Sequence, residues 1–172
     1  GEVRNRHTHQ GLAHESTWAR GEAWALYGYT MCYRETGDIK YLNQAKHVAE
    51  FIFNNPNLPS DLIPYWDFDA PEIPNEPRDV SAATVTASAL YELSTFDADM
   101  GSQYKEWADT ILVNITESYR ATLNSDRGFL LLHSTGSKPS NSEVDVPLSY
   151  ADYYFLEALL RKDKLENNKP LH

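Results

Sequence analysis

The chain has 172 residues, of which 41% are hydrophobic and 12% aromatic, enough for a single domain over residues 1–172 with a substantial core. Its net charge of −10 repels nucleic acids and other polyanions, so local positive charge must bind any anion. The one cysteine, Cys32, excludes an internal disulfide, and no segment approaches the roughly 18 apolar residues of a membrane-spanning helix. We therefore expect no nucleic-acid partner and no membrane segment, while the periplasm and the cytoplasm both remain open.

Residues 1 to 16 are polar and carry three histidines, His7, His9 and His14. His7 and His9 would share one side of an extended segment, but no acid or cysteine completes a recognisable ligand set, so we expect no metal site. Gln10 lies among these histidines. Its amide can donate to and accept from sugar hydroxyls, or it can cap the local backbone.

A helical hairpin is predicted next. Apolar periodicity indicates one helix from about residue 18 to 36 and a second from about 39 to 54. The connection between them is so short that the two helices must be antiparallel neighbours. The expected end signals are Ser16 or Thr17 and then Gly37 for the first helix, and Asp38 for the second.

The first two turns of this hairpin hold Trp18, Arg20 and Trp24. A helix N-terminus favours an anion, a guanidinium matches a carboxylate with two hydrogen bonds, and indole faces suit the apolar face of a sugar ring. The three residues therefore suggest a site for an acidic sugar. The alternative is that both tryptophans belong to the core and Arg20 pairs with a nearby acid.

The connection from 55 to 79 contains six of the nine prolines together with several aromatic residues, which favours an ordered loop. Asp67 and Asp69 would point to the same side of an extended segment, as paired carboxylates in acid–base chemistry do. Alternatively, aspartates in such a loop satisfy backbone amides. Arg78 and Asp79 are expected to have mostly structural roles.

A second hairpin follows. The helix from about 80 to 95, capped by Asp79 or Ser81, carries small residues on nearly every face, so several neighbours can approach it and we expect it to be central. The helix from about 102 to 119 has one apolar face and is expected to be peripheral.

The remainder combines a loop region at 120–147 with a final aromatic-rich helix at about 148–164. Residues 129–132 are a possible short strand. His133 is either a sugar ligand or a hydrogen-bonded loop histidine. The tail at 164–172 is expected to fray.

Helices that start near residues 18, 80 and 148 give a repeat of roughly 60 to 70 residues, each with an inner helix, a short turn, an outer helix and a long return loop. An α/α barrel is built in this way. The prediction is an all-α fold of about five helices with long connecting loops, which leaves the ring open. An open ring exposes apolar faces, so we expect association with a second copy of the chain.

The run TWARGEAWALYGY resembles the WARGQAW signature of glycoside hydrolase family 88, the unsaturated glucuronyl hydrolases. Members are about twice as long, form an (α/α)6 barrel of six hairpins, and carry two catalytic aspartates in their N-terminal half. The resemblance thus implies a C-terminal half whose catalytic residues lie upstream, and the protein's own N-terminal half is then the alternative partner for the open ring. Further stretches match in the same order: HQG at 9–11, PYWDFDAP at 64–71, PRD at 77–79, LLLH at 130–133 with Gly136 and Lys138-Pro139, and EVDVPLSYADYYFLEAL at 143–159.

The resemblance implies removal of a 4,5-unsaturated uronic acid from lyase-generated oligosaccharides. A protonated aspartate donates to the vinyl ether, water adds to the neighbouring carbon, and no metal or organic cofactor is required. Gln10, Trp18, Arg20 and Trp24 match substrate-binding positions, with Asp67, Asp69 and His133 as weaker pocket candidates. Glu22 departs from the family's usual glutamine. Two alternatives remain, namely a related hydrolase acting on unsaturated rhamnogalacturonan products and a non-catalytic sugar-binding or helical scaffold.

Overall fold

The computed structural model describes all residues from 1 to 172 and contains five α-helices, one short 3-10 turn at Asp126–Gly128 and no strands. The expected all-α fold of about five helices is confirmed. The helices are α1 (Ala19–Thr36), α2 (Ile39–Asn54), α3 (Val80–Leu93), α4 (Gly101–Ser118) and α5 (Ser149–Glu166). No helix of the chain is long and apolar enough to cross a membrane.

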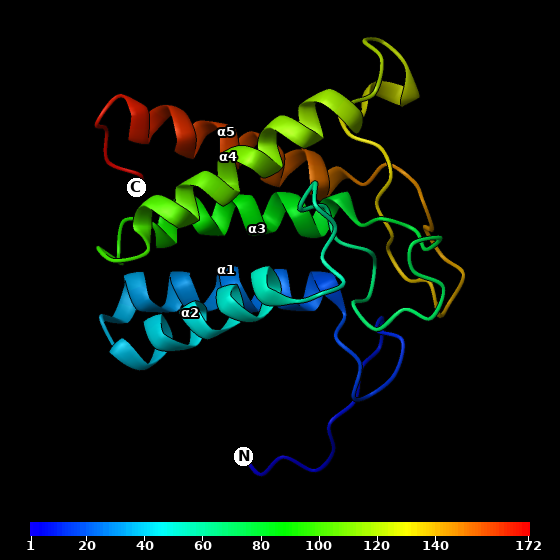
Figure 1. Ribbon diagram of the computed structural model, residues 1–172, viewed down its shortest axis with the longest axis horizontal. Helices are drawn as coiled ribbons and strands as arrows, with labels where there is room; N and C mark the ends of the chain where they lie inside the picture. The colour runs from blue at the N-terminus through cyan, green and yellow to red at the C-terminus, as the bar shows by residue number, and fades with distance from the viewer.

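The helices form two layers (Figure 1). α1, α3 and α5 lie in a parallel row, with α3 packed between the other two. α2 packs on α1, and α4 packs mainly on α3. All three long loops therefore gather at one end of the molecule, next to the N-termini of α1, α3 and α5.

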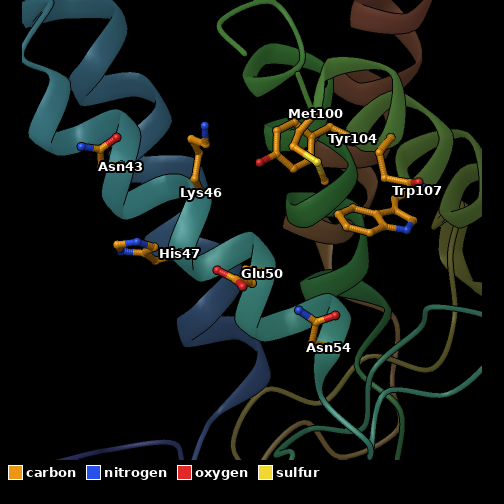
Figure 2. Close-up of a pocket in the computed structure, with 9 residues that line it drawn as sticks. Asn43, Lys46, His47, Glu50, Asn54, Met100, Tyr104 and Trp107 are labelled. Atoms are coloured by element: carbon orange, nitrogen blue, oxygen red, sulfur yellow. The ribbon is translucent and has the colours of Figure 1, made fainter. Parts of the chain in front are cut away.

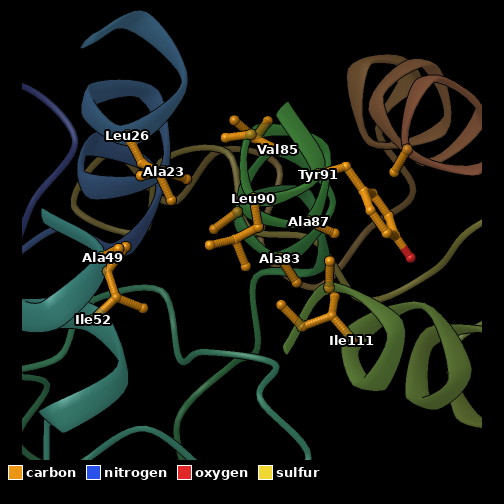
Figure 3. Packing of buried hydrophobic residues seen from close by; sticks show 14 of the residues in the cluster. Ala23, Leu26, Ala49, Ile52, Ala83, Val85, Ala87, Leu90, Tyr91 and Ile111 are labelled. Atoms are coloured by element: carbon orange, nitrogen blue, oxygen red, sulfur yellow. The ribbon is translucent and has the colours of Figure 1, made fainter. Parts of the chain in front are cut away.

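The central helix α3 is buried along its whole length, as its small residues predicted. Alanine, serine and threonine side chains let α1, α4 and α5 approach α3 closely from different sides. Figure 3 shows Ala83, Val85 and Leu90 of α3 between Leu26 of α1 and Ile111 of α4. The core is thus organised around α3.

Most of the predicted helix ends are confirmed. Gly37 adopts the left-handed conformation with φ of 67° and donates its N–H to the carbonyl of Tyr33. The Asp38 carboxylate accepts from the backbone N–H of Lys40, and Asp79 caps α3. These short-range signals act within one turn, which is why sequence alone reveals them.

The predicted N-cap of α1 is wrong. Trp18, not Ser16 or Thr17, occupies this position and makes no capping bond through its side chain. The Ala19 N–H donates instead to the carbonyl of Trp66 at 3.1 Å. A loop distant in sequence therefore satisfies the start of α1.

The possible strand at 129–132 is also not formed. Leu131 makes only an isolated bridge with Arg120. The backbone N–H groups of Leu130 and Leu131 donate to the carboxylate of Asp152 at 2.9 and 3.0 Å, so a side chain of α5 takes the place of a neighbouring strand.

The residues after α5 run back along the helical layers. Lys164 Nζ donates to the carbonyl of Leu171 at 2.9 Å. His172 lies 2.9 Å from the buried Glu92 carboxylate of α3.

Candidate substrate site

The N-terminal segment and the 55–79 loop are joined at the start of α1. Trp18 and Asp67 form an antiparallel bridge, and the Phe68 N–H donates to the carbonyl of Thr17 at 2.9 Å. Together with the bond from Ala19 to Trp66, this pairing fixes the position of the first turn of α1.

Arg20 is almost fully buried at this end of α1. Its Nη1 donates to Asp79 Oδ2 at 2.5 Å and to the carbonyl of Thr135 at 2.6 Å, and lies 3.2 Å from Ser81 Oγ. Its Nη2 donates to the carbonyl of Gly136 at 2.5 Å. The guanidinium thus links α1, the N-terminus of α3 and the segment 133–136.

Asp79 is the anionic partner and has no exposure to solvent. Burial raises the pKa of its carboxyl, while the Arg20 charge and hydrogen bonds from Ser81, Ala82 and Thr135 act in the opposite direction. Arg20 therefore pairs with a nearby acid, which on the sequence alone was the alternative to a sugar site.

Gln10 reaches the same segment from the N-terminal residues, since its Nε2 donates to the carbonyl of Gly136 at 2.8 Å. Gly136 makes this convergence possible. A Cβ added there would lie 2.7 Å from Cβ of Glu143, closer than atoms can pack. Gln10 and Arg20 thus donate hydrogen bonds to the same carbonyl oxygen.

Two aromatic rings flank the Arg20 guanidinium. Its Cζ lies 4.8 Å from the ring centroid of Trp18 and 5.5 Å from that of Tyr150. Gly21 gives the indole its room, because a Cβ at that position would lie 2.9 Å from Cε3 of Trp18. The glycine of the TWARGEAW run is therefore explained by close packing of the tryptophan against the helix.

Trp24 belongs to an aromatic wall farther along α1 and α5. Its ring meets Tyr154 edge to face at a centroid distance of 5.1 Å, and Tyr27 meets Tyr154 at 5.3 Å. At the end of this wall, the Glu157 carboxylate accepts from Tyr27 at 3.2 Å and from Ser88 at 2.5 Å. Small residues on α3 allow the α1 and α5 side chains to meet.

Sequence reasoning did not assign Tyr150, Tyr154 or Glu157 to the site. A signal was present, because tyrosines at 150 and 154 are one helical turn apart and share a face. What the sequence lacked was the knowledge that this face of α5 is turned toward Trp24.

Asp67 and Asp69 both bind backbone amides, as their alternative reading expected. Asp67 is fully buried and accepts from the Leu12 N–H and from Ser16 Oγ, each at 2.8 Å. Asp69 accepts from the Thr17 N–H at 2.8 Å. Both carboxylates hold the N-terminal segment against the loop.

His133 lies apart from the Arg20 cluster. Its Nδ1 is 2.7 Å from Asp145 Oδ1, and both residues have positive φ, 64° and 54°. The pair borders a cavity of about 530 Å³ together with Arg78 and Tyr119. The sequence-predicted residues therefore occupy three places, namely the Arg20 cluster with Trp24, the loop anchor, and the His133 cavity.

Glu22 has no hydrogen bond or ion pair with another side chain, and burial raises the pKa of its carboxyl. Residues two positions apart point to different faces of a helix, so Glu22 and Arg20 lie on different sides of α1. The departure from glutamine thus leaves the Arg20 ion pair undisturbed.

The histidines of the N-terminal segment contact each other. His7 Nδ1 lies 3.2 Å from His14 Nε2, and His14 Nδ1 accepts from the Thr8 N–H at 3.2 Å. No group of three histidine, cysteine or acidic side chains is arranged to hold a metal ion.

The layered helical hairpins, with aromatic rings and hydrogen-bonding groups at the loop end, define this chain as part of an α/α-barrel protein. The chain is homologous to the unsaturated glucuronyl hydrolases along nearly its whole length. It is 49% identical over 166 residues to the unsaturated glucuronyl hydrolase of Formosa agariphila, a match that covers 96% of this chain and 41% of that protein. No family model matches the chain.

Further relatives support the same assignment. An unsaturated chondroitin disaccharide hydrolase of Streptococcus agalactiae is 34% identical over 158 residues, covering 90% of this chain and 39% of that protein. The solved structure of an unsaturated glucuronyl hydrolase specific for heparin matches with a TM-score of 0.94 and 50% identity, over 97% of this chain and 45% of that structure. The chain thus spans less than half the length of these relatives.

Two solved relatives contain unsaturated oligosaccharides. One, with dGlcA-Glc-Rha-Glc, has a TM-score of 0.87 and 30% identity over 95% of this chain and 44% of its own. The other, from Streptococcus agalactiae with dGlcA-GalNAc6S, has a TM-score of 0.82 and 32% identity over 94% of this chain and 43% of its own.

Proposed function

We propose that this chain is the C-terminal, substrate-recognising half of an unsaturated glucuronyl hydrolase. The whole protein would remove a 4,5-unsaturated uronic acid from the end of an oligosaccharide released by a polysaccharide lyase. The observation that carries the proposal is the 49% identity over 96% of the chain to the Formosa agariphila enzyme. The aromatic wall and the polar cluster at the loop end supply the chemistry that binding such a sugar requires.

The proposed reaction is hydration of the vinyl ether. A carboxylic acid protonates the double bond, water adds to the neighbouring carbon, and the resulting hemiketal opens to release the sugar. The carboxylates near Arg20 are already occupied, since Asp79 pairs with Arg20 and Asp67 holds the N-terminal segment. The general acid is therefore expected among the residues that the longer relatives have in addition.

Arg20 retains hydrogen-bonding capacity for a substrate. A guanidinium has five N–H donors, and Nη1 together with one N–H of Nη2 serves the chain's own groups. The Nε–H and the second Nη2–H have no partner in the chain. They form one edge of the guanidinium, which matches a uronate carboxylate.

Gln10, Trp18 and Trp24 complete the proposed recognition surface. Gln10 uses its amide nitrogen on Gly136, so its Oε1 is free to accept from a sugar hydroxyl. The two indoles offer apolar faces to the sugar ring. Their role is to orient the unsaturated sugar for proton transfer from elsewhere in the barrel.

The experiment is an assay of the full-length gene product on three unsaturated disaccharides, derived from heparin, chondroitin and rhamnogalacturonan. Hydration destroys the conjugated enol ether, so loss of its ultraviolet absorbance reports turnover. We expect activity on the uronate disaccharides, highest on the heparin-derived one because the relative specific for heparin is 50% identical. The 172-residue chain alone should be inactive. A folded full-length product that acts on none of the three, or only on the rhamnogalacturonan product, would overturn the proposal.

A further inference from the structure

A groove separates the two outer helices. α2 packs on α1 and α4 packs on α3. A cavity of about 530 Å³ remains between α2 and α4 (Figure 2). This volume lies within the range of roughly 300–1,000 Å³ that is usual for small-molecule sites. The groove is built from the outer helices, whereas the Arg20 cluster lies among the loops at one end of the molecule.

The sequence spacing explains why both helices turn polar or aromatic residues into this groove. The lining residues of each helix recur at intervals of three or four positions, with one adjacent pair on each helix, so each set forms one helical face. The lining residues are Asn43, Lys46, His47, Glu50 and Asn54 on the α2 side, and Met100, Gln103, Tyr104 and Trp107 on the α4 side.

Two of these side chains are held in place by residues that do not line the groove. Trp107 stacks on Phe53 of α2 at a centroid distance of 3.9 Å and an interplanar angle of 5°. Lys46 Nζ pairs with the buried Asp97 at 2.7 Å. Burial opposes ionisation of Asp97, but hydrogen bonds from Lys46 and the Met100 backbone outweigh it and lower the pKa of that carboxyl. The indole and the ammonium are therefore preorganised.

Other lining side chains are free. Those of Asn43, His47, Glu50 and Asn54 make no hydrogen bond or ion pair with the rest of the chain, although they border one cavity with a fixed indole. Amides and carboxylates placed around an aromatic ring are the groups that bind sugar hydroxyls and the apolar face of a pyranose.

We propose that this α2–α4 groove is a second carbohydrate-binding site, which takes an uncharged, hydroxyl-rich sugar unit such as an N-acetylhexosamine. An anionic sugar is disfavoured because Lys46 is already neutralised by Asp97, Glu50 adds a negative charge, and the chain carries a net charge of −10. The indole of Trp107 would support the ring, and Asn54 and Glu50 would bind its hydroxyls. This inference stands independently of the proposed hydrolase activity.

The experiment is an NMR titration of the ¹⁵N-labelled full-length gene product with N,N′-diacetylchitobiose, following the tryptophan indole N–H signals. Trp107→Phe assigns its own signal. We expect a saturable shift of the Trp107 signal with a Kd on the order of 1 mM, as one stacked ring and a few hydrogen bonds provide. The indole signals of Trp18 and Trp24, at the loop end, should move less.

Two variants separate a groove site from unspecific binding. Asn54→Ala removes an exposed amide of the groove, and we expect Kd to rise about fivefold. Gln44→Ala removes an exposed amide on the same helix outside the groove and should leave Kd unchanged. The proposal is wrong if the Trp107 signal does not shift, if only Trp18 or Trp24 responds, or if both variants bind like the unchanged chain.

Discussion

Arg20 joins the candidate site to the stability of the fold, because its partner Asp79 has no access to solvent. Arg20→Met would leave that carboxylate buried without its cation. Breaking a buried pair in this way costs about 3–5 kcal/mol, so we expect the free energy of unfolding in urea to fall by about that amount. Adding Asp79→Asn should recover part of the loss, since asparagine also caps helices well.

Arg78→Met is the matched control for this change. Arg78 also pairs with an aspartate, Asp61, but the two side chains are 26% and 30% exposed. Partly exposed pairs contribute about 1 kcal/mol or less. Equal losses in Arg20→Met and Arg78→Met would contradict the role given to burial.

Glu22 is a second single residue that affects stability, and its effect should depend on pH. Burial raises the pKa of its carboxyl above the unfolded value of about 4.3, so the charged form is disfavoured in the folded protein. The wild type therefore loses stability relative to Glu22→Gln as the pH rises above about 4. We expect Glu22→Gln to be the more stable protein at pH 7 in thermal unfolding.

Below about pH 4 the carboxyl is protonated in both the folded and the unfolded state, and the difference between Glu22→Gln and wild type should vanish. Glu35→Gln is a suitable control, because Glu35 is exposed and pairs with Arg34. An advantage of Glu22→Gln that grew toward low pH would contradict the raised pKa.

The sequence singled out the candidate site residues but not their partners. Trp18, Arg20 and Trp24 stood out because they are unusual within two turns of one helix, which is local information. Asp79 lies 59 positions from Arg20, and Gly136 lies 116 positions away, so only the fold brings them together. Arg20 and Asp67 each had two possible roles on the sequence alone, and the contacts that distinguish these roles are all long-range.

At the scale of an element, α3 is defined by the small size of its side chains. Ala87 is fully buried on this helix, where α4 and α5 both pack against it. Ala87→Leu would force extra volume into a filled space, and overpacking of this kind typically costs about 1–3 kcal/mol. We expect a matching decrease in unfolding free energy, measured by urea titration of the circular dichroism signal.

Ser102→Leu on α4 controls for adding a leucine, since Ser102 is exposed and has space around it. We expect a change within about 0.5 kcal/mol. If Ala87→Leu were equally harmless, α3 would not be the closely packed centre described above.

Helix ends show where prediction from sequence succeeds and where it fails. Gly37, Asp38 and Asp79 bond to amides and carbonyls within their own turn, so the residue type at each position predicts the helix end. The start of α1 differs, because a serine that resembles an N-cap bonds instead to Asp67, more than fifty residues away. Likewise, the apolar run at 129–132 resembles a strand but has no partner strand beside it.

At the scale of the whole molecule, Asp109 of α4 links three helices. Its carboxylate accepts from Tyr91 of α3 at 2.6 Å, from Lys105 of α4 at 2.8 Å and from Lys162 of α5. Burial opposes its ionisation, but these hydrogen bonds and the lysine charges outweigh that effect and lower its pKa to about 2. The ionised carboxylate therefore stabilises the assembly of α3, α4 and α5.

Because the folded pKa lies below the unfolded value of about 3.9, this stabilisation is present above pH 4 and is lost as the pH falls through about 2. Asp109→Asn should lower the free energy of unfolding by about 2 kcal/mol at pH 7. The difference from wild type should shrink between about pH 4 and pH 2, measured by urea unfolding at each pH. A difference independent of pH would mean that the loss comes from packing alone.

The outer side of α5 indicates what the chain lacks when it stands alone. Tyr153, Leu156, Leu159 and Leu160 lie within two turns and are between 38% and 60% exposed. Solved relatives superpose on nearly the whole chain but are more than twice as long, so their additional residues are available to cover such a face. Contiguous apolar surface of this kind promotes association.

We therefore expect the isolated chain to bind a hydrophobic dye and to self-associate in light scattering. Leu156→Glu combined with Leu160→Glu should reduce both signals without changing the helical circular dichroism, because neither side chain belongs to the core. Leu123→Glu is the control, since Leu123 is an isolated loop residue that is 83% exposed, and its replacement should change neither signal. If the full-length gene product fails to bind the dye, the remainder of the barrel covers α5, whereas a dimer of the full-length product that dissociates in the double variant assigns this face to a second copy. A monomeric, dye-free isolated chain would show that the α5 face needs no partner.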